Sequence, residues 1–345
     1  MATNKNITMK QFNGTDYDTL YPKTKVEQVE GAYSQQQILA DSTKAMLGFG
    51  ADAVPDDLFK TLGAELIVTT EAGTVVTASR NGKTVIATSN SSGLAVLKIP
   101  EFGTWTVSAT INGVSISIDY EIKAIAQYEL GLTTDLETAS WAVIDFISKS
   151  GNAASVWSVG DKKTIKLNGI SYTAQIIGFN HDTKTSGDKA GITFQLVDCL
   201  NDSYPMNNHN INHGGWKSSE MRYYMSKYLV QLDEDLQSAI KAVNKKTSAG
   251  DKSSSINTTS DKLFLLSEVE IFGSATLSFA GEGSQYDWYK AGNTKVKKIR
   301  GSAFSWWNRS PSRSSNEYFC AVADDGKAGY ITADYSVGVS FAFCV

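Results

Sequence analysis

Cysteine, histidine and proline are scarce in this sequence of 345 residues, which contains 3, 3 and 5 of them respectively. No CxxC pair, EF-hand loop or HxxxH pair on an expected helix occurs, so we expect no metal site. So few cysteines also exclude a small secreted domain stapled by disulfides. The formal net charge of −4 lacks the basic excess of a general nucleic-acid-binding protein, and we expect no nucleic acid partner.

Long apolar runs are missing as well. No segment approaches the roughly 20 apolar residues that cross a bilayer, and the opening MATNKNITMK lacks the apolar core of a signal peptide. We therefore expect synthesis in a cytoplasm without a signal peptide, and no membrane insertion. Hydrophobic residues nevertheless make up 41% of the chain, which is enough for real cores in a multi-domain protein.

The first region, residues 1–62, is polar at its start and offers little material for a core of its own. Residues 34–47 carry a helical pattern, and Pro55 opens a short helical turn. Such a segment is either a flexible tail or an arm that gains order by packing on another chain. We expect this helical and extended arm to serve attachment and oligomerisation.

The second region, residues 63–127, contains six short runs rich in Val, Ile and Thr. Turn signals separate the runs, and Asn81-Gly82 and Asn112-Gly113 supply the positive φ angles that tight hairpins need. Six strands at this spacing predict a small antiparallel β-sandwich. The run GLAVLKIPEFGTWTV also resembles immunoglobulin-like modules of the carboxypeptidase-regulatory type.

The third region, residues 132–345, has the pattern of an α+β domain. A helix is predicted from residue 132 onward, followed by strands over TIKLNG, SYTAQIIGFN and ITFQLVD. Ser218 and Asp233 are predicted N-caps of two further helices. The polar composition of residues 245–260 predicts a loop, and KLFLLS and EVEIFG predict short strands.

The segment SWWNRSP, residues 305–311, is the most unusual part of the sequence. We predict that Trp306 and Trp307 anchor a core and that Arg309 fixes a loop through several donors. Residues 308–335 are rich in Asn, Ser, Arg, Asp, Tyr and Gly, which is typical of binding loops. An ordinary solvated loop has a similar composition and is the alternative.

Catalytic signals are weak by comparison. His209 and His213 lie in NNHNINHGG, where helix is disfavoured, and we expect them to order a loop; His181-Asp182 reads as a turn. Motifs for a nucleophile elbow, a phosphate loop or a dinucleotide site do not occur.

The remaining reactive or charged candidates are predicted to be inert. Cys199, Cys320 and Cys344 lie in apolar surroundings, which indicates buried, unreactive thiols. The run KVKKIR, residues 295–300, predicts a solvated positive patch. The sequence therefore favours binding over catalysis.

Four segments of the third region resemble a family of phage and prophage domains with a WW-x-R-S-P core: residues 159–182, GGWKSSEMR (214–222), RGSAFSWWNRSP (300–311) and the closing GVSFAF (338–343). That family looks like the C-type-lectin-like, formylglycine-generating-enzyme-like fold, which also forms the variable receptor-binding tips encoded by diversity-generating retroelements. Ser340-Phe341 departs from the family's usual Arg-Pro near the end. The opening ITMKQFNGTDYDTLYPKT resembles the start of tail-fibre and baseplate-associated proteins.

The resemblance implies a tail fibre or receptor-binding protein of a phage or phage-derived particle. It implies a location in the virion tail, a homotrimer, other tail proteins bound through the N-terminus, and a bacterial surface glycan or protein bound at the tip. The alternatives are an envelope-polysaccharide hydrolase or formylglycine-type enzyme, and a structural baseplate or spacer protein without a ligand. The expected ligand-binding residues are Asn308, Arg313, Ser314, Asn316, Tyr318, Asp324, Tyr330, Asp334 and Tyr335.

A core of five residues is expected to hold that surface in place: Trp216, Arg222, Trp306, Trp307 and Arg309. No cofactor is predicted. Asp324, Asp325 and Asp334 could supply oxygen ligands for calcium, but their spacing matches no known calcium loop.

Overall fold

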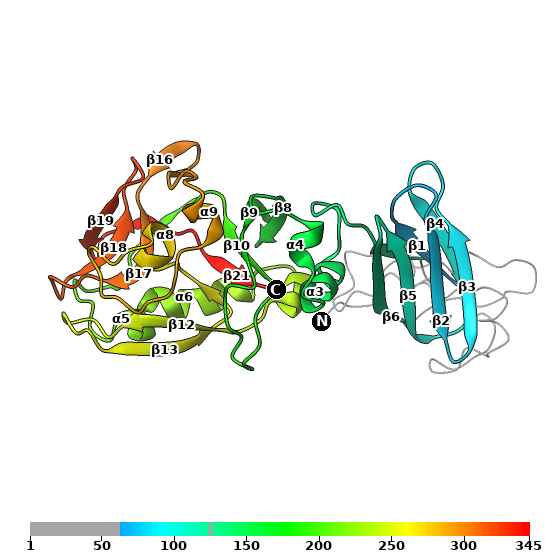
Figure 1. The fold of residues 1–345 in the computed structure, drawn as a ribbon, viewed down its shortest axis with the longest axis horizontal. Helices are drawn as coiled ribbons and strands as arrows, with labels where there is room; N and C mark the ends of the chain where they lie inside the picture. The colour runs from blue at the N-terminus through cyan, green and yellow to red at the C-terminus, as the bar shows by residue number, and fades with distance from the viewer. Residues whose placement is uncertain (1–62, 124–126) are drawn as a thin grey trace, which may run out of the picture. The chain divides into compact units, whose positions relative to one another are not determined.

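The computed structural model describes residues 63–123 and 127–345. The described residues form two compact units, one from residues 63–110, 117–123 and 127–131 and the other from residues 111–116 and 132–345 (Figure 1). The predicted arm of residues 1–62, with its helix and its turn at Pro55, lies outside the described residues. Together the described residues make a multi-domain protein that is rich in β-sheet and contains only short helices.

The N-terminal unit consists of two sheets, with strand orders β4-β1-β7 and β3-β2-β5-β6. Six of the strands confirm the six predicted runs. The seventh, β7, was not predicted, and it pairs parallel to β1, so the unit is not antiparallel throughout. The strands are β1 (Ala64–Thr69), β2 (Val75–Arg80), β3 (Lys83–Thr88), β4 (Leu94–Ile99), β5 (Gly103–Ile111), β6 (Val114–Ile122) and β7 (Gln127–Gly131).

Alternation of apolar and polar side chains explains these strands. In β4 the residues Ala95, Leu97 and Ile99 are buried while their neighbours along the strand are exposed, as a two-residue period requires. Asn81 and Asn112 have φ angles of 49° and 50°, and each precedes a glycine of positive φ. Both predicted hairpin turns are thereby confirmed.

The C-terminal unit contains two five-stranded sheets, with orders β14-β21-β10-β9-β8 and β11-β20-β17-β18-β19, and the hairpins β12-β13 and β15-β16. The last strand of the chain, β21, lies inside the first of these sheets, between β14 and β10. The strands are β8 (Lys162–Leu167), β9 (Ile170–Phe179), β10 (Ile192–Leu196), β11 (Ser203–Tyr204), β12 (Val243–Ser248), β13 (Ile256–Asp261), β14 (Leu263–Phe264), β15 (Lys297–Ile299), β16 (Ser302–Phe304), β17 (Trp306–Pro311), β18 (Tyr318–Val322), β19 (Ala328–Thr332), β20 (Val337–Gly338) and β21 (Ala342–Cys344).

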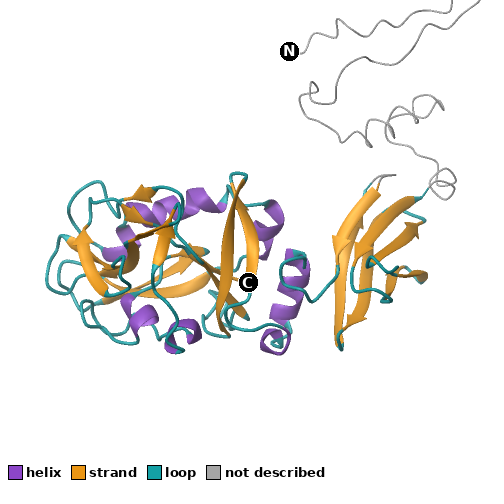
Figure 2. Ribbon diagram, turned by 90° about the horizontal axis from the view of Figure 1, so that it is seen from above, coloured by secondary structure: helices purple, strands orange, loops and turns teal. Residues whose placement is uncertain are grey.

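Short helices surround these sheets (Figure 2). They are α3 (Trp141–Lys149), α4 (Ala153–Val156), α5 (Gly215–Ser218), α6 (Glu220–Leu229), α7 (Glu234–Ala239), α8 (Glu268–Phe272) and α9 (Asp287–Lys290). Asp233 is the N-cap of α7 as predicted, whereas the cap of α6 is Ser219 and not Ser218. The helix predicted from residue 132 begins later, at Trp141, because Ser140 caps it by accepting from the Val143 amide. None of the described helices has the length and apolar character needed to cross a bilayer.

Two predictions for this unit were wrong. Residues 245–260 form most of the hairpin β12-β13 and not a loop. The polar side chains of the hairpin that face inward can be buried because they have polar partners there. EVEIFG forms helix α8 and not a strand. Ser267 caps α8 in a capping box with Glu270, and Gly273 ends it with a φ of 77°.

Candidate functional site

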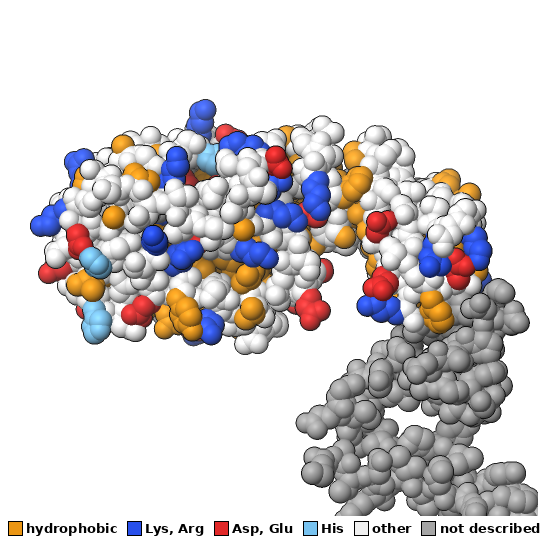
Figure 3. Space-filling view, turned by 90° about the horizontal axis from the view of Figure 1, so that it is seen from below, with side chains coloured by type: hydrophobic (Ala, Val, Ile, Leu, Met, Phe, Trp, Pro, Cys, Tyr) orange, Lys and Arg blue, Asp and Glu red, His pale blue; other side chains and the backbone are white. Residues whose placement is uncertain are grey.

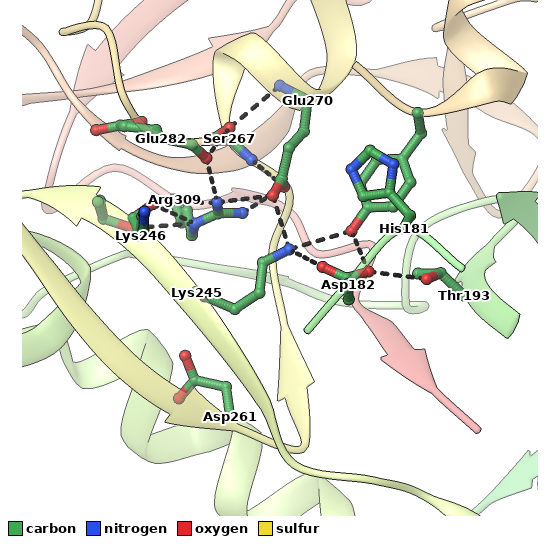
Figure 4. Close-up of polar contacts among 12 residues, drawn as sticks. His181, Asp182, Thr193, Lys245, Lys246, Asp261, Ser267, Glu270, Glu282 and Arg309 are labelled. Carbon is green, nitrogen blue, oxygen red and sulfur yellow. Dashed lines mark hydrogen bonds and ion pairs between the residues drawn. The ribbon is translucent and has the colours of Figure 1, made fainter. Parts of the chain in front are cut away.

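The interior of the C-terminal unit contains a group of charged side chains that we call the buried ion network: Asp182, Lys245, Glu270, Glu282 and Arg309 (Figure 4). Lys245 Nζ lies 2.7 Å from Asp182 Oδ1 and 2.7 Å from Glu270 Oε1. It also lies 4.2 Å from the centre of the Phe264 ring. The ammonium group therefore joins two carboxylates in an apolar setting, where charge pairing is strong.

Arg309 is the second cation of the network, beside Glu270, and is fully buried. Its Nη1 and Nη2 donate to the two carboxylate oxygens of Glu270, and its Nη2 also donates to the Glu282 carbonyl at 2.7 Å. Its Nη1 reaches the carbonyl of Leu265 at 2.9 Å. The N–H groups of the planar guanidinium thus donate to α8, to the segment before α8 and to the segment after α8.

The second carboxylate of the network is equally well satisfied. Asp182 Oδ2 accepts from Thr193 Oγ1 and from Tyr286 Oη, each at 2.8 Å. Burial opposes ionisation of Asp182, but Lys245 outweighs burial and holds the pKa of this carboxyl well below its ordinary value. Burial likewise opposes ionisation of Glu270, and the charges of Arg309 and Lys245 lower its pKa.

Glu282 behaves differently from the other two acids. Its carboxylate accepts from the Ser248 amide at 2.8 Å and from Ser310 Oγ. Burial raises the pKa of Glu282 to about 7, against an ordinary value of 4.5. The two cations of the network already balance Asp182 and Glu270, so a third buried negative charge has no cation of its own. The contacts of the network therefore tie β12, α8 and β17 together.

The predicted core tryptophans are confirmed. Trp216, Trp306 and Trp307 are fully buried. Each indole N–H has an acceptor: Asp261 Oδ2 at 2.9 Å for Trp216, the Lys295 carbonyl at 2.9 Å for Trp306 and the Tyr204 carbonyl at 2.8 Å for Trp307. Arg309 is also part of the core, as predicted, whereas the side chain of Arg222 remains 32% exposed.

One predicted ligand-binding residue is placed differently from the expectation. Asn308 is fully buried, so it cannot belong to an exposed surface. Its neighbours on β17 are buried as well, because the whole strand runs through the interior. Neither polar atom of the Asn308 amide has a hydrogen-bond partner among the residues that the structure describes.

The other eight predicted residues are accessible to different extents. Most gather at one end of the β18-β19 hairpin, where Tyr318 stacks on Tyr330 with ring centroids 5.1 Å apart and an interplanar angle of 18°. Tyr330 is 49% exposed and Tyr335 is 62% exposed. Seven residues form what we call the hairpin surface: Arg313, Ser314, Asn316, Tyr318, Tyr330, Asp334 and Tyr335.

The hairpin surface is fastened to the body of the unit by backbone contacts. The side-chain Nδ2 of Asn212 donates to the carbonyls of Ser315 and Tyr318, both at 2.8 Å. The backbone N–H of Asn212 donates to the Asn316 carbonyl at 2.7 Å. The Arg313 amide donates to the carbonyl of Leu277 at 2.9 Å. The side chains of the hairpin surface are therefore carried on a backbone that is already fixed, which lowers the entropy cost of binding a ligand.

Asp324 does not join the hairpin surface. It lies in the turn between β18 and β19, where the Ala323 amide bonds the Lys327 carbonyl, at the opposite end of β18 from Tyr318. The possible calcium ligands therefore lie at opposite ends of the hairpin, because Asp324 and Asp325 are in this turn and Asp334 follows β19. Within the described residues, no group of three or more His, Cys, Asp or Glu side chains is arranged to hold a metal ion.

The cysteines are buried, and the basic run is only partly exposed. Cys199, Cys320 and Cys344 are free and buried, as predicted, and burial raises the pKa of Cys199 to about 12. The predicted solvated patch at residues 295–300 is only partly correct. Lys297 is buried, its Nζ donates to the Val197 carbonyl at 2.9 Å, and burial lowers its pKa to about 8.

The sequence reasoning missed Lys245, Glu270 and Glu282, and it read Asp182 only as part of a turn. One local signal was present, because Ser267 and Glu270 have the spacing of a capping box. Nothing local marks Lys245, which is 63 residues from Asp182.

A family model described as "Domain of unknown function (DUF6273)" matches residues 190–345, which is less than half of the chain. No curated protein matches the sequence.

Two solved structures show weak similarity. The TIE protein of Bacillus anthracis is 13% identical over 39% of this chain and 27% of that one, with a TM-score of 0.19. A fimbrial protein from Bacteroides ovatus is 8% identical over 82% of this chain and 71% of that one, with a TM-score of 0.27. The match with the first structure spans only about a quarter of that protein's length. Scores this low do not indicate a shared fold.

Proposed function

We propose that this chain is a non-enzymatic binding protein, of the type that forms receptor-binding fibres on the tails of phages or phage-derived particles. In this proposal the hairpin surface binds a bacterial surface ligand, a glycan or a protein. The N-terminal unit is an immunoglobulin-like spacer and the C-terminal unit a C-type-lectin-like tip. Residues 1–62 attach the chain to other tail proteins in a homotrimer, whose repeated sites add through effective concentration.

The observation that carries this proposal is the stacked, accessible pair of Tyr318 and Tyr330 on a braced hairpin. Tyrosine rings offer a large contact area at a low cost in conformational entropy, and a tyrosine hydroxyl can bond a polar ligand. The exposed Tyr335 ring adds area of the same kind. Two of the three acids in the buried ion network, Asp182 and Glu270, are instead bound to the cations Lys245 and Arg309.

The test is whole-cell binding by the full-length protein. The double variant Tyr330→Ala/Tyr335→Ala should bind envelope-bearing cells about tenfold more weakly, since hot-spot aromatic residues commonly contribute more than 1 kcal/mol each. The matched control is Val230→Ala/Ile170→Ala, which removes exposed apolar area elsewhere in the same unit. Unchanged binding by the tyrosine variant would contradict the proposal and favour a spacer. Release of reducing ends from envelope polysaccharide would instead indicate a hydrolase.

A further inference from the structure

A groove with a cavity volume of about 440 Å³ lies where α5 and α6 meet the end of β13. Its walls carry basic, aromatic and hydroxyl side chains over an apolar floor. Figure 3 shows the face of the C-terminal unit on which basic side chains lie among exposed hydrophobic ones. The lining residues that matter here are Lys217, Arg222, Tyr223, Met225, Ser260 and Lys262. None of them belongs to the hairpin surface.

The groove is positively charged although the whole chain carries a formal net charge of −4. Lys217, Arg222 and Lys262 line it, and the acid among its lining residues is Asp261. That carboxylate is buried and occupied, because Oδ1 accepts from Arg222 Nε at 2.7 Å and Oδ2 accepts from Trp216 Nε1 at 2.9 Å. Asp261 therefore neutralises one cation at most and leaves an excess of positive charge.

Arg222 is held in position for a ligand. Its Nε is fixed by Asp261, and its Nη2 donates to the Ser260 carbonyl at 3.2 Å. No described residue accepts a hydrogen bond from its Nη1, and the two lysines are exposed. A guanidinium clamped on one edge presents its other edge as a preorganised donor for an oxyanion.

The remaining lining suits a sugar ring. Tyr223 is 58% exposed, and Lys227 Nζ lies 5.1 Å from its ring centre. An exposed aromatic face packs against the C–H face of a pyranose, and the exposed hydroxyl of Ser218 can exchange hydrogen bonds with sugar hydroxyls. The geometry points to a second ligand site in this groove, which takes an acidic saccharide through its carboxylate or phosphate groups. This inference goes beyond the proposed function, because it concerns different residues and a defined ligand class.

The test uses the full-length protein and three soluble polymers: polygalacturonate, which carries carboxylates, a glycerol-phosphate polymer, and neutral dextran. We expect binding of at least one anionic polymer at low salt, with little binding of dextran, and weakening as salt is raised. The variant Lys217→Gln/Lys262→Gln should weaken that binding at least tenfold without loss of folding, because both lysines are exposed. The control Lys166→Gln/Lys290→Gln makes the same change in net charge outside the groove and should alter binding less than twofold.

The two anionic polymers show which anionic group of the ligand the groove binds. Preference for polygalacturonate assigns a uronate ligand, and preference for the glycerol-phosphate polymer assigns a phosphodiester. The inference is overturned if neither polymer binds, if dextran binds equally well, or if both lysine pairs weaken binding to the same extent. Failure here is distinguishable from failure of the proposed function, because Tyr330→Ala/Tyr335→Ala should leave polymer binding intact.

Discussion

The two units of this protein differ in what they bury. In the N-terminal unit the described core is apolar, and its buried polar side chains are the small hydroxyls of Thr70, Thr74 and Ser89. The C-terminal unit buries full charges, including Lys245 and Arg309. An apolar core is stabilised by area removed from water, whereas a charged core is stable only when every buried charge is paired.

The two kinds of core differ in the consequences of losing one group. Removing a methylene from an apolar core costs the transfer free energy of the removed atoms, and the cavity left behind adds a second cost. Removing one member of a buried ion pair leaves its partner charged and unsolvated, which costs more. Substitutions in the two units of this single chain can rank these costs.

The largest expected effect comes from Arg309→Met. This change removes both contacts to Glu270 and leaves the Leu265 and Glu282 carbonyls without that donor. We expect the free energy of unfolding of the C-terminal unit to fall by about 3–5 kcal/mol. Hydrogen exchange measured on peptides of each unit reports the loss, which should be confined to residues 132–345.

The matched control is Arg313→Met, which removes an exposed arginine four residues further along the chain. It should change stability by less than about 0.5 kcal/mol. Equal effects of the two variants would mean that the buried ion network does not brace the unit. A change in protection of the N-terminal unit would mean that the two cores are not independent.

The second prediction concerns the apolar core of the N-terminal unit. Leu66 is fully buried on β1, and Leu66→Ala should lower the free energy of unfolding of the N-terminal unit by about 3 kcal/mol. Val96, on the neighbouring strand β4, is exposed. Val96→Ala should therefore have little effect, and chemical denaturation of both variants checks the difference. A loss from Leu66→Ala larger than that from Arg309→Met would reverse the proposed ranking.

The difference between an apolar and a charged core also explains which parts of the fold can be predicted from the sequence. The six predicted strands of the N-terminal unit are correct because Ala95, Leu97 and Ile99 alternate with exposed residues, and this pattern is local. The β12-β13 hairpin was predicted as a loop because its buried side chains include Lys245 and Thr247, which are polar. These side chains can be buried only because partners from distant parts of the chain surround them.

The candidate site was predictable to a similar extent. Trp306 and Trp307 are large and apolar, and a prediction of burial for such residues needs no knowledge of their partners. Asn308 follows them directly, and its polarity favoured an exposed position that the buried strand β17 does not provide. The groove was not predicted, because Lys217 and Lys262 are 45 positions apart and meet only in the folded unit.

The third prediction is a pH dependence that belongs to the C-terminal unit. Burial raises the pKa of Glu282 in the folded state to about 7, from an ordinary value of 4.5. The folded state therefore binds a proton that the unfolded state has released between these values. The free energy of unfolding should fall as the pH rises through this window, by about 1 kcal/mol for each pH unit, and this contribution should level off about one pH unit above the folded-state pKa.

Chemical denaturation at pH 5, 6 and 7 measures this slope. Glu282→Gln keeps the neutral shape of the side chain and should remove the slope, while Glu234→Gln, at an exposed position on α7, should retain it. The N-terminal unit should show no corresponding slope over the same window. A slope that survives in Glu282→Gln would assign the pH dependence to another group.

The smallest expected effect tests whether a buried polar group stabilises the C-terminal unit when it is unpaired. The Asn308 amide has no hydrogen-bond partner among the described residues, so Asn308→Leu, which keeps the shape of the side chain, should raise the free energy of unfolding by about 1 kcal/mol. The control is Asn207→Leu. Asn207 is also buried, but its amide donates to the Ile211 carbonyl at 2.6 Å and accepts from the Glu220 amide at 3.0 Å. That variant should lose about 1–3 kcal/mol, because it leaves two backbone groups unpaired. If Asn308→Leu instead destabilises the unit, the Asn308 amide contributes to the stability of this core, and removing an unpaired polar group does not relieve a cost there.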